Sequence, residues 1–342
     1  MRIAVVSSPV TALRPAQLGG AQAFICDLAA GLARRGHDVV LYCAEGSEVA
    51  GVRLATVPVP SDATEALVMP GGREPPPAPG VEAALAAMFE SIAAEGFDMV
   101  SQHAFDAPAF RLAKDLPVLH TLHLPPIVRA VVRSAAAIPA ARLATVSHSC
   151  LDAWRRAGVQ VAQVLPNGVA PGPDPAAPVK RQALVAGRIS PEKGIEHAIA
   201  AALQAGLAVQ VAGAHYDPAY DVDLTGAEVL GPLPREELRR LMAGSAVTIC
   251  AVRWDEPFGM VAAEAQMSGC PVAAYRRGAM AEVVEDGVSG MLAEPDDVPS
   301  LARAIEGCIE LDRWSVRASA MRRLALDSTL DRYEVALEGG SR

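Results

Sequence analysis

The sequence predicts an α/β protein built from two doubly wound parallel-sheet domains. Short apolar, β-branched runs alternate with Ala- and Leu-rich segments of helical period, and this pattern occurs twice along the 342 residues. Such alternation requires right-handed β-α-β crossovers, and these produce a parallel sheet. With 51% hydrophobic residues the chain can bury two cores. We therefore expect two domains that face each other across a cleft, with ligands at the carboxyl ends of the strands.

Six apolar runs in the first half predict buried strands. They are RIAVVSS (2–8), HDVVLYCA (37–44), VRLATVPV (52–59), FDMVSQHA (97–104), PVLHTLHL (117–124) and RLATVSHS (142–149). The segment 21–36 between the first two runs predicts an amphipathic helix that ends at Gly36. A Pro- and Gly-rich segment, 68–80, predicts a surface loop.

The strand pattern stops at 164–181, where five prolines and two glycines predict a linker, and then restarts. The second strand series is QALVAGRIS (182–190), AVQVAGAH (208–215), AEVLGPL (227–233), AVTICAVRW (246–254), CPVAAYRR (270–277) and SGMLAEP (289–295). Helices are expected near 194–205, 234–243, 260–268 and 297–310.

Composition excludes several classes of protein. The formal charge of -9 argues against a general nucleic-acid binder, so any anion site must be local. The six cysteines show no C-x-x-C pair or zinc-like spacing, which predicts reduced and mostly buried thiols without a disulfide framework or metal cluster. The apolar run at the N-terminus is too short for a signal peptide, and no stretch approaches ~18 uninterrupted apolar residues. We therefore expect a cytoplasmic protein.

The segment GRISPEKG (187–194) places two cations between a predicted strand and a predicted helix. Arg188 offers a planar fork and Lys193 a point charge, so together they can hold a diphosphate from two sides. Such a clamp would stabilise the negative charge that develops on a leaving group. The alternative is a solvated loop in which Glu192 pairs with Lys193.

Gly19 and Gly20 lie between the first strand and the first helix. Two glycines there can bring the backbone close to a ligand, and the free amides of a helix from Ala21 would favour a phosphate. A plain turn is the alternative. Neither a G-x-G-x-x-G fingerprint nor a Walker A loop occurs.

The segment DEPFGMVAAEAQ (255–266) holds two acids eight positions apart, Glu256 and Glu264. Pro257 and Gly259 oppose one continuous helix of two solvent-facing acids and predict a helix that begins near Met260. A hydrolase-like acid and nucleophile pair is another alternative, but its carboxyls would have to flank one bond at ~5–9 Å. We expect Glu264, on a helix behind the phosphate site, to lie too far from the anomeric carbon for that role.

Several histidines fall at or near predicted strand ends in the first half, namely His103, His120, His123 and His148. A histidine in such a place more often makes structural hydrogen bonds than performs catalysis. His103 and Asp106 lie at the end of a strand that neighbours the strand of His123, so both could contact an acceptor. The D-x-D pattern at 221–223 lies inside a polar loop and not at the end of a strand, so we expect solvated surface and no metal site.

Six motifs in order resemble the retaining GT-B glycosyltransferases of family GT4. They are GGAQAF (19–24), TLHLPP (121–126), TVSHS (145–149), LPNGV (165–169), GRISPEKG (187–194) and EPFGMVAAEA (256–265). The resemblance implies an N-terminal acceptor-side domain (1–168), a C-terminal nucleotide-sugar domain (169–312) and a helical segment (313–342) that crosses back to the first. Composition and compact length also resemble family members of actinomycete antibiotic pathways, such as orthosomycin synthesis.

The resemblance also implies roles for residues. The catalytic set would be Arg188, Lys193, His123 and Glu256, in which the cations hold the donor diphosphate and His123 and Glu256 face the sugar. Donor-binding positions would be Gly19, Gly20, Gly187, Gly213, Phe258, Gly259, Met260, Val261 and Glu264. Among these, the amides of 258–261 would bind the diphosphate and Glu264 the ribose. Where the family often has Gly-Gly-x-Glu this chain has Ala21-Gln22, so an acidic contribution to acceptor binding is in doubt.

The implied activity is retaining transfer of a sugar from a nucleoside-diphosphate sugar, UDP-linked as the first choice, to a small-molecule or oligosaccharide acceptor. No metal or other cofactor is expected, because cations and helix amides can neutralise the leaving group. Membrane contact is possible in this family but Arg129, Arg133 and Arg142 are too thinly spaced to indicate it. Two alternatives stay open, a sugar-nucleotide epimerase of similar architecture and a non-catalytic nucleotide-sugar-binding partner.

Overall fold

The chain folds into two compact units. A computed structural model describes residues 1–14, 19–67, 74–216 and 220–340. Unit 1 comprises Met1–Pro15, Ala21–Pro166 and Leu326–Arg342, and unit 2 comprises Ala16–Gly20 and Asn167–Ala325. Unit 1 is therefore discontinuous in sequence, because its last helix follows the whole of unit 2.

Unit 1 contains a seven-stranded parallel sheet in the order β3-β2-β1-β4-β5-β6-β7. Its strands are β1 (Arg2–Val6), β2 (Asp38–Ala44), β3 (Arg53–Val57), β4 (Met99–Gln102), β5 (Val118–Leu122), β6 (Leu143–Thr145) and β7 (Gln163–Val164). The first six lie within the six predicted runs. The sequence did not predict β7, because a strand of two residues leaves no period to detect.

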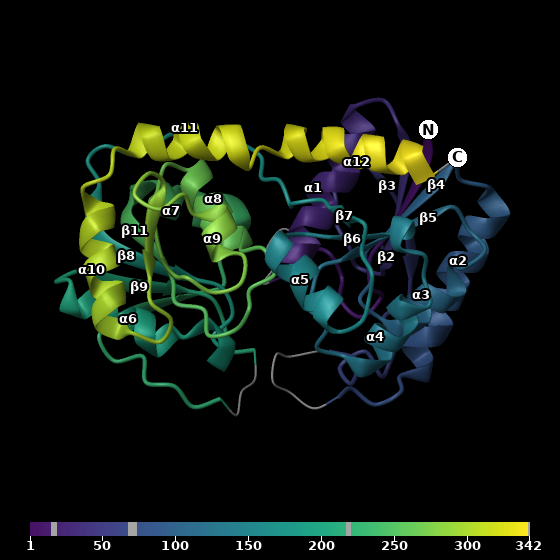
Figure 1. Ribbon diagram of the computed structural model, residues 1–342, viewed down its shortest axis with the longest axis horizontal. Coiled ribbons are helices and arrows are strands. Elements are labelled where there is room, and N and C mark those ends of the chain that lie inside the picture. The colour runs from purple at the N-terminus through teal and green to yellow at the C-terminus, as the bar shows by residue number, and fades with distance from the viewer. Residues whose placement is uncertain (15–18, 68–73, 217–219, 341–342) are drawn as a thin grey trace. The chain divides into compact units, whose positions relative to one another are not determined.

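The helices of unit 1 cover both faces of its sheet (Figure 1). They are α1 (Gly20–Arg34), α2 (Pro79–Glu95), α3 (Ala107–Leu112), α4 (Arg129–Ala136), α5 (His148–Arg156) and α12 (Leu326–Gly340), with a 3-10 turn η1 (Ala140–Arg142). Val100 and Val118 form a core with α2 on one face. On the other face Phe24 of α1 lies 5.8 Å from Tyr333 of α12, measured between ring centroids.

Unit 2 contains a six-stranded parallel sheet in the order β10-β9-β8-β11-β12-β13. Its strands are β8 (Lys180–Ala186), β9 (Ala208–Ala212), β10 (Ala227–Gly231), β11 (Ser245–Cys250), β12 (Val272–Tyr275) and β13 (Gly290–Ala293). Its helices are α6 (Ile195–Gln204), α7 (Arg235–Gly244), α8 (Met260–Met267), α9 (Met280–Val283), α10 (Val298–Ile309) and α11 (Arg313–Arg323), with a 3-10 turn η2 (Pro191–Lys193). Helices α6 and α10 cover one face, where Ile199 and Ile305 join the sheet residues in one core (Figure 1).

The two sheets confirm the predicted fold class of two Rossmann-like parallel-sheet domains. In each sheet the strand order reverses beside the first strand, between β1 and β4 in unit 1 and between β8 and β11 in unit 2. Ligands of doubly wound sheets bind at such a switch point, outside the carboxyl ends of the strands. Candidate ligand-binding residues are therefore those that follow these four strands and the neighbouring strand β5.

The C-terminal segment divides at a different residue from the expected 313. Helix α11 belongs to unit 2, because Arg317 donates to the carbonyl oxygens of Pro173, at 3.0 Å, and Met267. Ser319 of the same helix donates to Glu285 at 2.5 Å. Only the segment from Leu326 onward groups with unit 1. Contacts between segments that are far apart in the sequence set this boundary, and a helical period does not encode such contacts.

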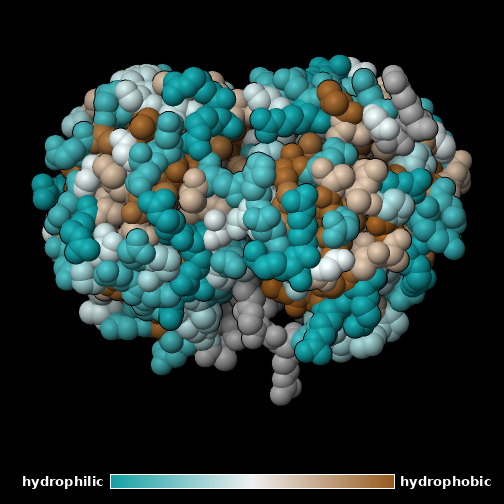
Figure 2. All heavy atoms as spheres, viewed as in Figure 1, coloured by the Kyte–Doolittle hydropathy of each residue, from teal (hydrophilic) through white to brown (hydrophobic). Residues whose placement is uncertain are grey.

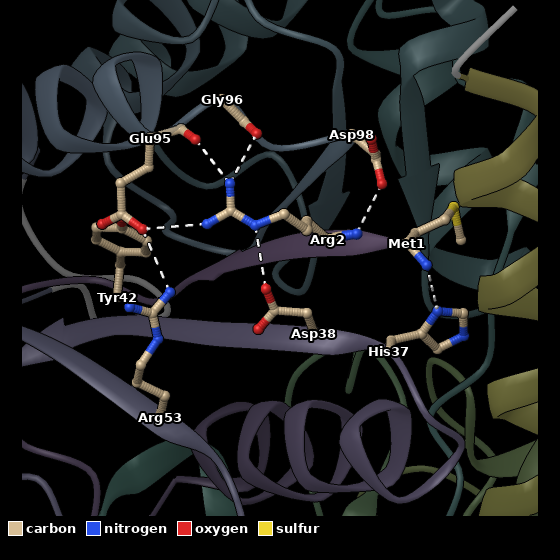
Figure 3. A network of polar contacts seen from close by, with 9 residues as sticks. All are labelled: Met1, Arg2, His37, Asp38, Tyr42, Arg53, Glu95, Gly96 and Asp98. Atoms are coloured by element: carbon tan, nitrogen blue, oxygen red, sulfur yellow. Dashed lines mark hydrogen bonds and ion pairs between the residues drawn. The ribbon is translucent and has the colours of Figure 1, made fainter.

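A polar network closes the amino edge of the first sheet (Figure 3). The Arg2 guanidinium donates to Asp38 at 3.0 Å and to the carbonyl oxygens of Glu95 and Gly96 at 2.7 and 3.1 Å. Its backbone amide donates to Asp98 at 2.7 Å. The fork of one arginine thus joins β1, β2 and the end of α2 at the edge opposite the carboxyl ends of the strands.

The described part of the loop 68–80 contacts the start of α4, while residues 68–73 lie outside the described residues. The Glu74 carboxylate accepts from the backbone amides of Arg129 and Ala130 at 3.2 and 3.0 Å. These two amide hydrogen bonds hold the pKa of Glu74 below its usual value. A carboxylate there satisfies helix amides that have no partner within the helix.

The face shown in Figure 2 is mainly hydrophilic, with hydrophobic side chains interspersed on both units. Within the described ranges, no helix is both long enough and apolar enough to cross a bilayer.

Candidate functional site

The segment after β8 forms a tight cationic turn. Gly187 (φ 124°) turns the chain out of the strand, and η2 and Gly194 (φ 59°) lead it into α6. An Arg188 amino group (Nη2) lies 3.1 Å from Glu192 Oε1, which also accepts from Ser190 at 2.7 Å. The guanidinium carbon of Arg188 lies 5.0 Å from the centre of the Tyr216 ring. The partner of Glu192 is thus Arg188, and the pairing of Glu192 with Lys193 that the sequence left open is not found.

Lys193 pairs with Glu256 instead. Its ammonium nitrogen lies 2.8 Å from Glu256 Oε2, and the Trp254 indole N–H donates to the same oxygen at 2.8 Å. Burial alone would raise the pKa of Glu256, but the Lys193 charge and the hydrogen bonds from Lys193 and Trp254 bring the pKa below its usual value. The carboxylate is therefore ionised at neutral pH, with both donors on one oxygen.

The loop after Trp254 becomes a helix at Met260, as Pro257 and Gly259 predicted. Gly259 (φ 98°) occupies the N-cap position of α8, and α8 begins at Met260. The Glu256 carbonyl accepts from the Ala279 amide at 2.8 Å. A β-carbon at the neighbouring Gly278 would lie 2.4 Å from the Glu256 nitrogen. The turn around Gly278 thus fixes the Glu256 backbone. Phe258 lies directly before the N-cap, and Val261 is the second residue of α8.

Glu264 lies on α8 with an ion-pair partner that the sequence did not suggest. Arg235, the first residue of α7, places Nε 2.5 Å from Glu264 Oε1. Glu264 is buried and Arg235 is about a quarter exposed. Because 29 residues separate the two, no local period could reveal the pair. The signal available in the sequence is a basic residue directly after Pro234, at the start of the helix expected near 234–243.

The predicted glycines fall in two places. Gly187 and Gly213 pack against each other, because a β-carbon at Gly213 would lie 1.8 Å from the Gly187 carbonyl oxygen. Their first role is to let the ends of β8 and β9 approach. Gly19 precedes α1, and Gly20 is its first residue, one position before the expected start.

In unit 1, two of the predicted residues, His103 and His123, lie directly after the carboxyl ends of β4 and β5. His103 Nδ1 lies 2.9 Å from His123 Nε2, and His103 Nε2 lies 2.8 Å from the hydroxyl of Ser101. Burial lowers the pKa of His123 to about 4, and burial together with His123 and His120 lowers the pKa of His103 well below its usual value. Both imidazoles are therefore neutral at physiological pH.

Asp106 also lies in this region but does not join the histidine pair. It occupies the N-cap position of α3 without a capping hydrogen bond from its side chain. Burial raises its pKa to about 6 despite a hydrogen bond with Ser8. Its Oδ2 is buried and has no hydrogen-bond partner among the described residues. His120 has a structural place, with its ring stacked on Phe110 at 4.8 Å between centroids.

The D-x-D pattern at 221–223 lies in a loop before β10. Asp223 accepts from the backbone amide of Thr225 at 2.9 Å, a local turn. The two outer residues, Asp221 and Asp223, are exposed.

Known protein families match both halves of the chain. The family model described as Glycosyltransferase Family 4 matches residues 18–172, and the model described as Glycosyl transferases group 1 matches residues 174–321. A D-inositol 3-phosphate glycosyltransferase of Nocardioides sp. is 40% identical over 110 residues, which are 30% of this chain and 24% of that protein. The match thus spans about a quarter of this relative's length.

Solved structures resemble the whole chain. The Anabaena protein HepE in complex with UDP has a TM-score of 0.73 at 20% identity, covering 99% of this chain and 100% of that chain. AviGT4, a glycosyltransferase involved in avilamycin A biosynthesis, has a TM-score of 0.73 at 21% identity, covering 99% and 97%. At these identities the likeness concerns the fold. The family assignment rests on the two family models, which together match residues 18–172 and 174–321. With the two doubly wound sheets, they show that the chain belongs to the GT-B glycosyltransferases of the group 1 and family 4 type.

Proposed function

We propose that the protein is a retaining glycosyltransferase that moves a sugar from a nucleoside-diphosphate sugar to a small-molecule or oligosaccharide acceptor. The observation that carries this proposal is the arrangement after β8 and β11. There Arg188 and Lys193 leave one strand end, and Glu256 and the start of α8 follow the other. This arrangement joins two cations, helix amides and one ionised carboxylate, which suit a diphosphate with a sugar attached.

The diphosphate would be held by Arg188, Lys193 and the amides of residues 258–261. Each cation has a carboxylate partner in the structure, Glu192 for Arg188 and Glu256 for Lys193. An ammonium has three hydrogens and a guanidinium has five, so both can contact a phosphate oxygen without leaving those partners. As the glycosidic bond breaks, charge grows on the phosphate, and these fixed donors stabilise it more than they stabilise the intact donor.

Glu256 would bind sugar hydroxyls. Its low pKa keeps the carboxylate ionised, which makes it an acceptor of hydrogen bonds and a poor general acid. Both protein donors use Oε2, and the described residues include no hydrogen-bond partner for Oε1. Oε1 is therefore the oxygen assigned to the sugar. Glu264, held by Arg235, would accept from the ribose, and His123 would face the transferred sugar.

The proposed chemistry uses no protein nucleophile and no metal. The bond between the anomeric carbon and the diphosphate oxygen breaks while the acceptor oxygen bonds to the same face of the sugar. The acceptor proton passes to the departing phosphate. Arg188 and Lys193 supply the positive charge that a metal ion would otherwise supply at the leaving group.

UDP is the proposed nucleotide. Solved complexes of the Anabaena HepE protein are described as containing UDP and UDP-glucose, and that fold matches this chain over its length. For the acceptor we propose a small molecule or oligosaccharide of an antibiotic pathway, in keeping with the fold similarity to AviGT4. His103 and Asp106, at the end of β4, are the residues assigned to acceptor contacts.

The test is a panel of UDP-, GDP-, dTDP- and ADP-sugars, with binding measured by thermal shift and transfer or hydrolysis measured by nucleotide release. Wild-type protein should be stabilised most by a UDP-sugar. Lys193→Ala and Glu256→Ala should lower turnover at least ~100-fold, because each removes a charged contact made to the reacting group. Lys180→Ala, an exposed residue at the start of β8, is the matched control. Absence of nucleotide-sugar binding, or full turnover in both variants, would refute the proposal.

A further inference from the structure

Ser101, His103 and His123 form a continuous row of hydrogen bonds in unit 1. Ser101 lies on β4, His103 directly follows β4 and His123 directly follows β5. The Ser101 hydroxyl lies 2.8 Å from His103 Nε2, and His103 Nδ1 lies 2.9 Å from His123 Nε2. The row ends at His123 Nδ1, which is buried and has no hydrogen-bond partner among the described residues.

The rings in this row have little freedom to turn. Phe24 of α1 lies 5.7 Å from His123 and Tyr333 of α12 lies 6.1 Å from His103, measured between ring centroids. Tyr333 is held in turn by its hydroxyl, 3.2 Å from the hydroxyl of Thr121 on β5. Both histidines are almost fully buried. The ring orientations are therefore fixed, and only the positions of the hydrogens on the ring nitrogens can differ.

The number of hydrogens on the two rings decides which partner donates in each hydrogen bond of the row. Each neutral imidazole carries one N–H and one lone pair. If Ser101 donates to His103 Nε2, the hydrogen of His103 lies on Nδ1 and is donated to His123 Nε2. His123 then carries its hydrogen on Nδ1. In the opposite direction Ser101 would accept from His103, and its own hydroxyl hydrogen would have no acceptor within the described part of the chain.

The opposite direction therefore leaves two polar groups unsatisfied, the Ser101 hydroxyl hydrogen and the His123 Nδ1 lone pair. The first direction leaves only one, the His123 Nδ1 hydrogen. A buried polar group without a partner costs free energy, so the first direction is favoured. Burial lowers the pKa of both histidines, which keeps each ring neutral and the count valid at pH 7.

We propose that Ser101 and His103 fix the Nδ1–H tautomer of His123, so that His123 donates a hydrogen bond through Nδ1 to an oxygen of the bound sugar. This inference rests on the proposed function and specifies the donor atom at that site. A sugar hydroxyl or ether oxygen would supply the acceptor that the protein itself does not. Ser101 and His103 act through His123 and are positioning residues.

The tautomers can be measured without substrate. In protein labelled with 15N at histidine, two-bond correlations distinguish Nδ1–H from Nε2–H rings, and His103 and His123 should both be Nδ1–H at pH 7. Ser101→Ala removes the hydroxyl and should produce a mixture of tautomers at both rings. Thr145→Val removes a different buried hydroxyl, one that donates to the Leu122 carbonyl at 3.2 Å, and should leave the tautomers unchanged. An Nε2–H ring at His123 in the wild type would overturn the inference.

A pair of substitutions tests the donor atom. The amide nitrogen of asparagine can take the place of Nδ1, whereas that of glutamine reaches the place of Nε2. His123→Asn should therefore retain at least ~10-fold more transfer activity than His123→Gln, with equal UDP affinity in both. Equal loss in the two variants, with the wild-type tautomers as expected, would overturn donation through Nδ1 and leave the proposed transfer intact. Failure of the wild type to transfer any sugar would instead refute the proposed function, while the tautomer measurement would still stand.

Discussion

At the residue scale, the proposed donor site contains partners that hold its charged groups in place. Trp254 is the clearest example, because its indole N–H and the Lys193 ammonium donate to the same oxygen of Glu256. The other carboxylate oxygen is thereby directed away from both donors. The Lys193 nitrogen also lies 5.9 Å from the centre of the Trp254 ring, so the indole contacts both members of the ion pair.

Trp254→Phe should weaken binding of the sugar and leave binding of the nucleotide unchanged. The substitution keeps an aromatic ring beside Lys193 and removes one hydrogen bond to a charged group, which corresponds to about 10-fold in affinity. The KM for the sugar nucleotide should therefore rise about 10-fold while the Kd of UDP, measured by calorimetry, stays constant. Trp314→Phe, at an exposed tryptophan of α11, is the control. An equal weakening of UDP would show that Trp254 supports the fold of the whole site and not the position of Glu256.

His120 predicts a pH dependence of stability. Burial, with a smaller effect from Arg142, lowers its pKa to about 3, and neither ring nitrogen has a hydrogen-bond partner among the described residues. An unfolded chain binds a proton at this histidine below about pH 6.5, but the folded chain does not. The free energy of unfolding should therefore fall as the pH falls from about 6.5 toward 3, by at most ~1.4 kcal/mol per pH unit for this group.

His120→Leu removes this titration and keeps an apolar side chain against Phe110. Urea unfolding at pH 7 and pH 5 should show a smaller loss of stability in the variant than in the wild type. At pH 7 the variant should be about as stable, because no hydrogen bond is lost. The same pH dependence in both proteins would show that His120 is solvated or bonded in solution.

The local backbone of the candidate site could be predicted from the sequence, whereas the pairings between distant residues could not. Pro257 and Gly259 act on the local backbone, so the helix start at Met260 was predictable. The bonds of Arg235 to Glu264 and of His103 to His123 join segments 29 and 20 residues apart, and only the fold brings them together.

At the element scale, strand ends are held close together by glycine contacts. Gly213 follows β9 and Gly187 follows β8, and a β-carbon on the first would overlap the carbonyl of the second. The sequence predicted both as ligand-binding residues. The structure shows a packing role, which a sequence pattern could not indicate because it depends on which strands are neighbours.

Gly213→Ala should destabilise unit 2 by ~1–3 kcal/mol, since the overlap of a β-carbon with a carbonyl oxygen forces the backbone to move. The melting temperature should fall by several degrees, as measured by circular dichroism. Gly244→Ala is the matched control, because a β-carbon at that helical position meets no atom within 4 Å. Equal melting temperatures for the two variants would mean that β8 and β9 can separate at their ends without cost.

At the scale of the whole chain, unit 1 is discontinuous in sequence, so it is completed by a helix that follows unit 2. Helix α12 comes last in sequence, yet it is part of unit 1, and its buried residues Leu330, Tyr333 and Leu337 cover α1 and the sheet. Arg35, directly after α1, adds ion pairs to Asp331 and Glu334, both at 2.7 Å. The sequence predicted a returning helical segment but not its first residue, because α11 and α12 have similar helical patterns.

A chain that ends at Ala325 should therefore lose the structure of unit 1 while unit 2 persists. Removing α12 exposes Phe24 and Gly31 of α1, against which Tyr333 and Leu330 pack, and leaves Arg35 without its carboxylates. Limited proteolysis with mass spectrometry should detect early cuts within residues 21–166 and protection of 167–325. Val335→Asp is the control that keeps α12, since Val335 is exposed on that helix, and it should behave as the wild type. If the truncated chain resists cleavage throughout, the first sheet and the other helices of unit 1 are sufficient for folding. In that case α12 does not hold unit 1 together, and its contribution is to position His103 and His123 through Tyr333.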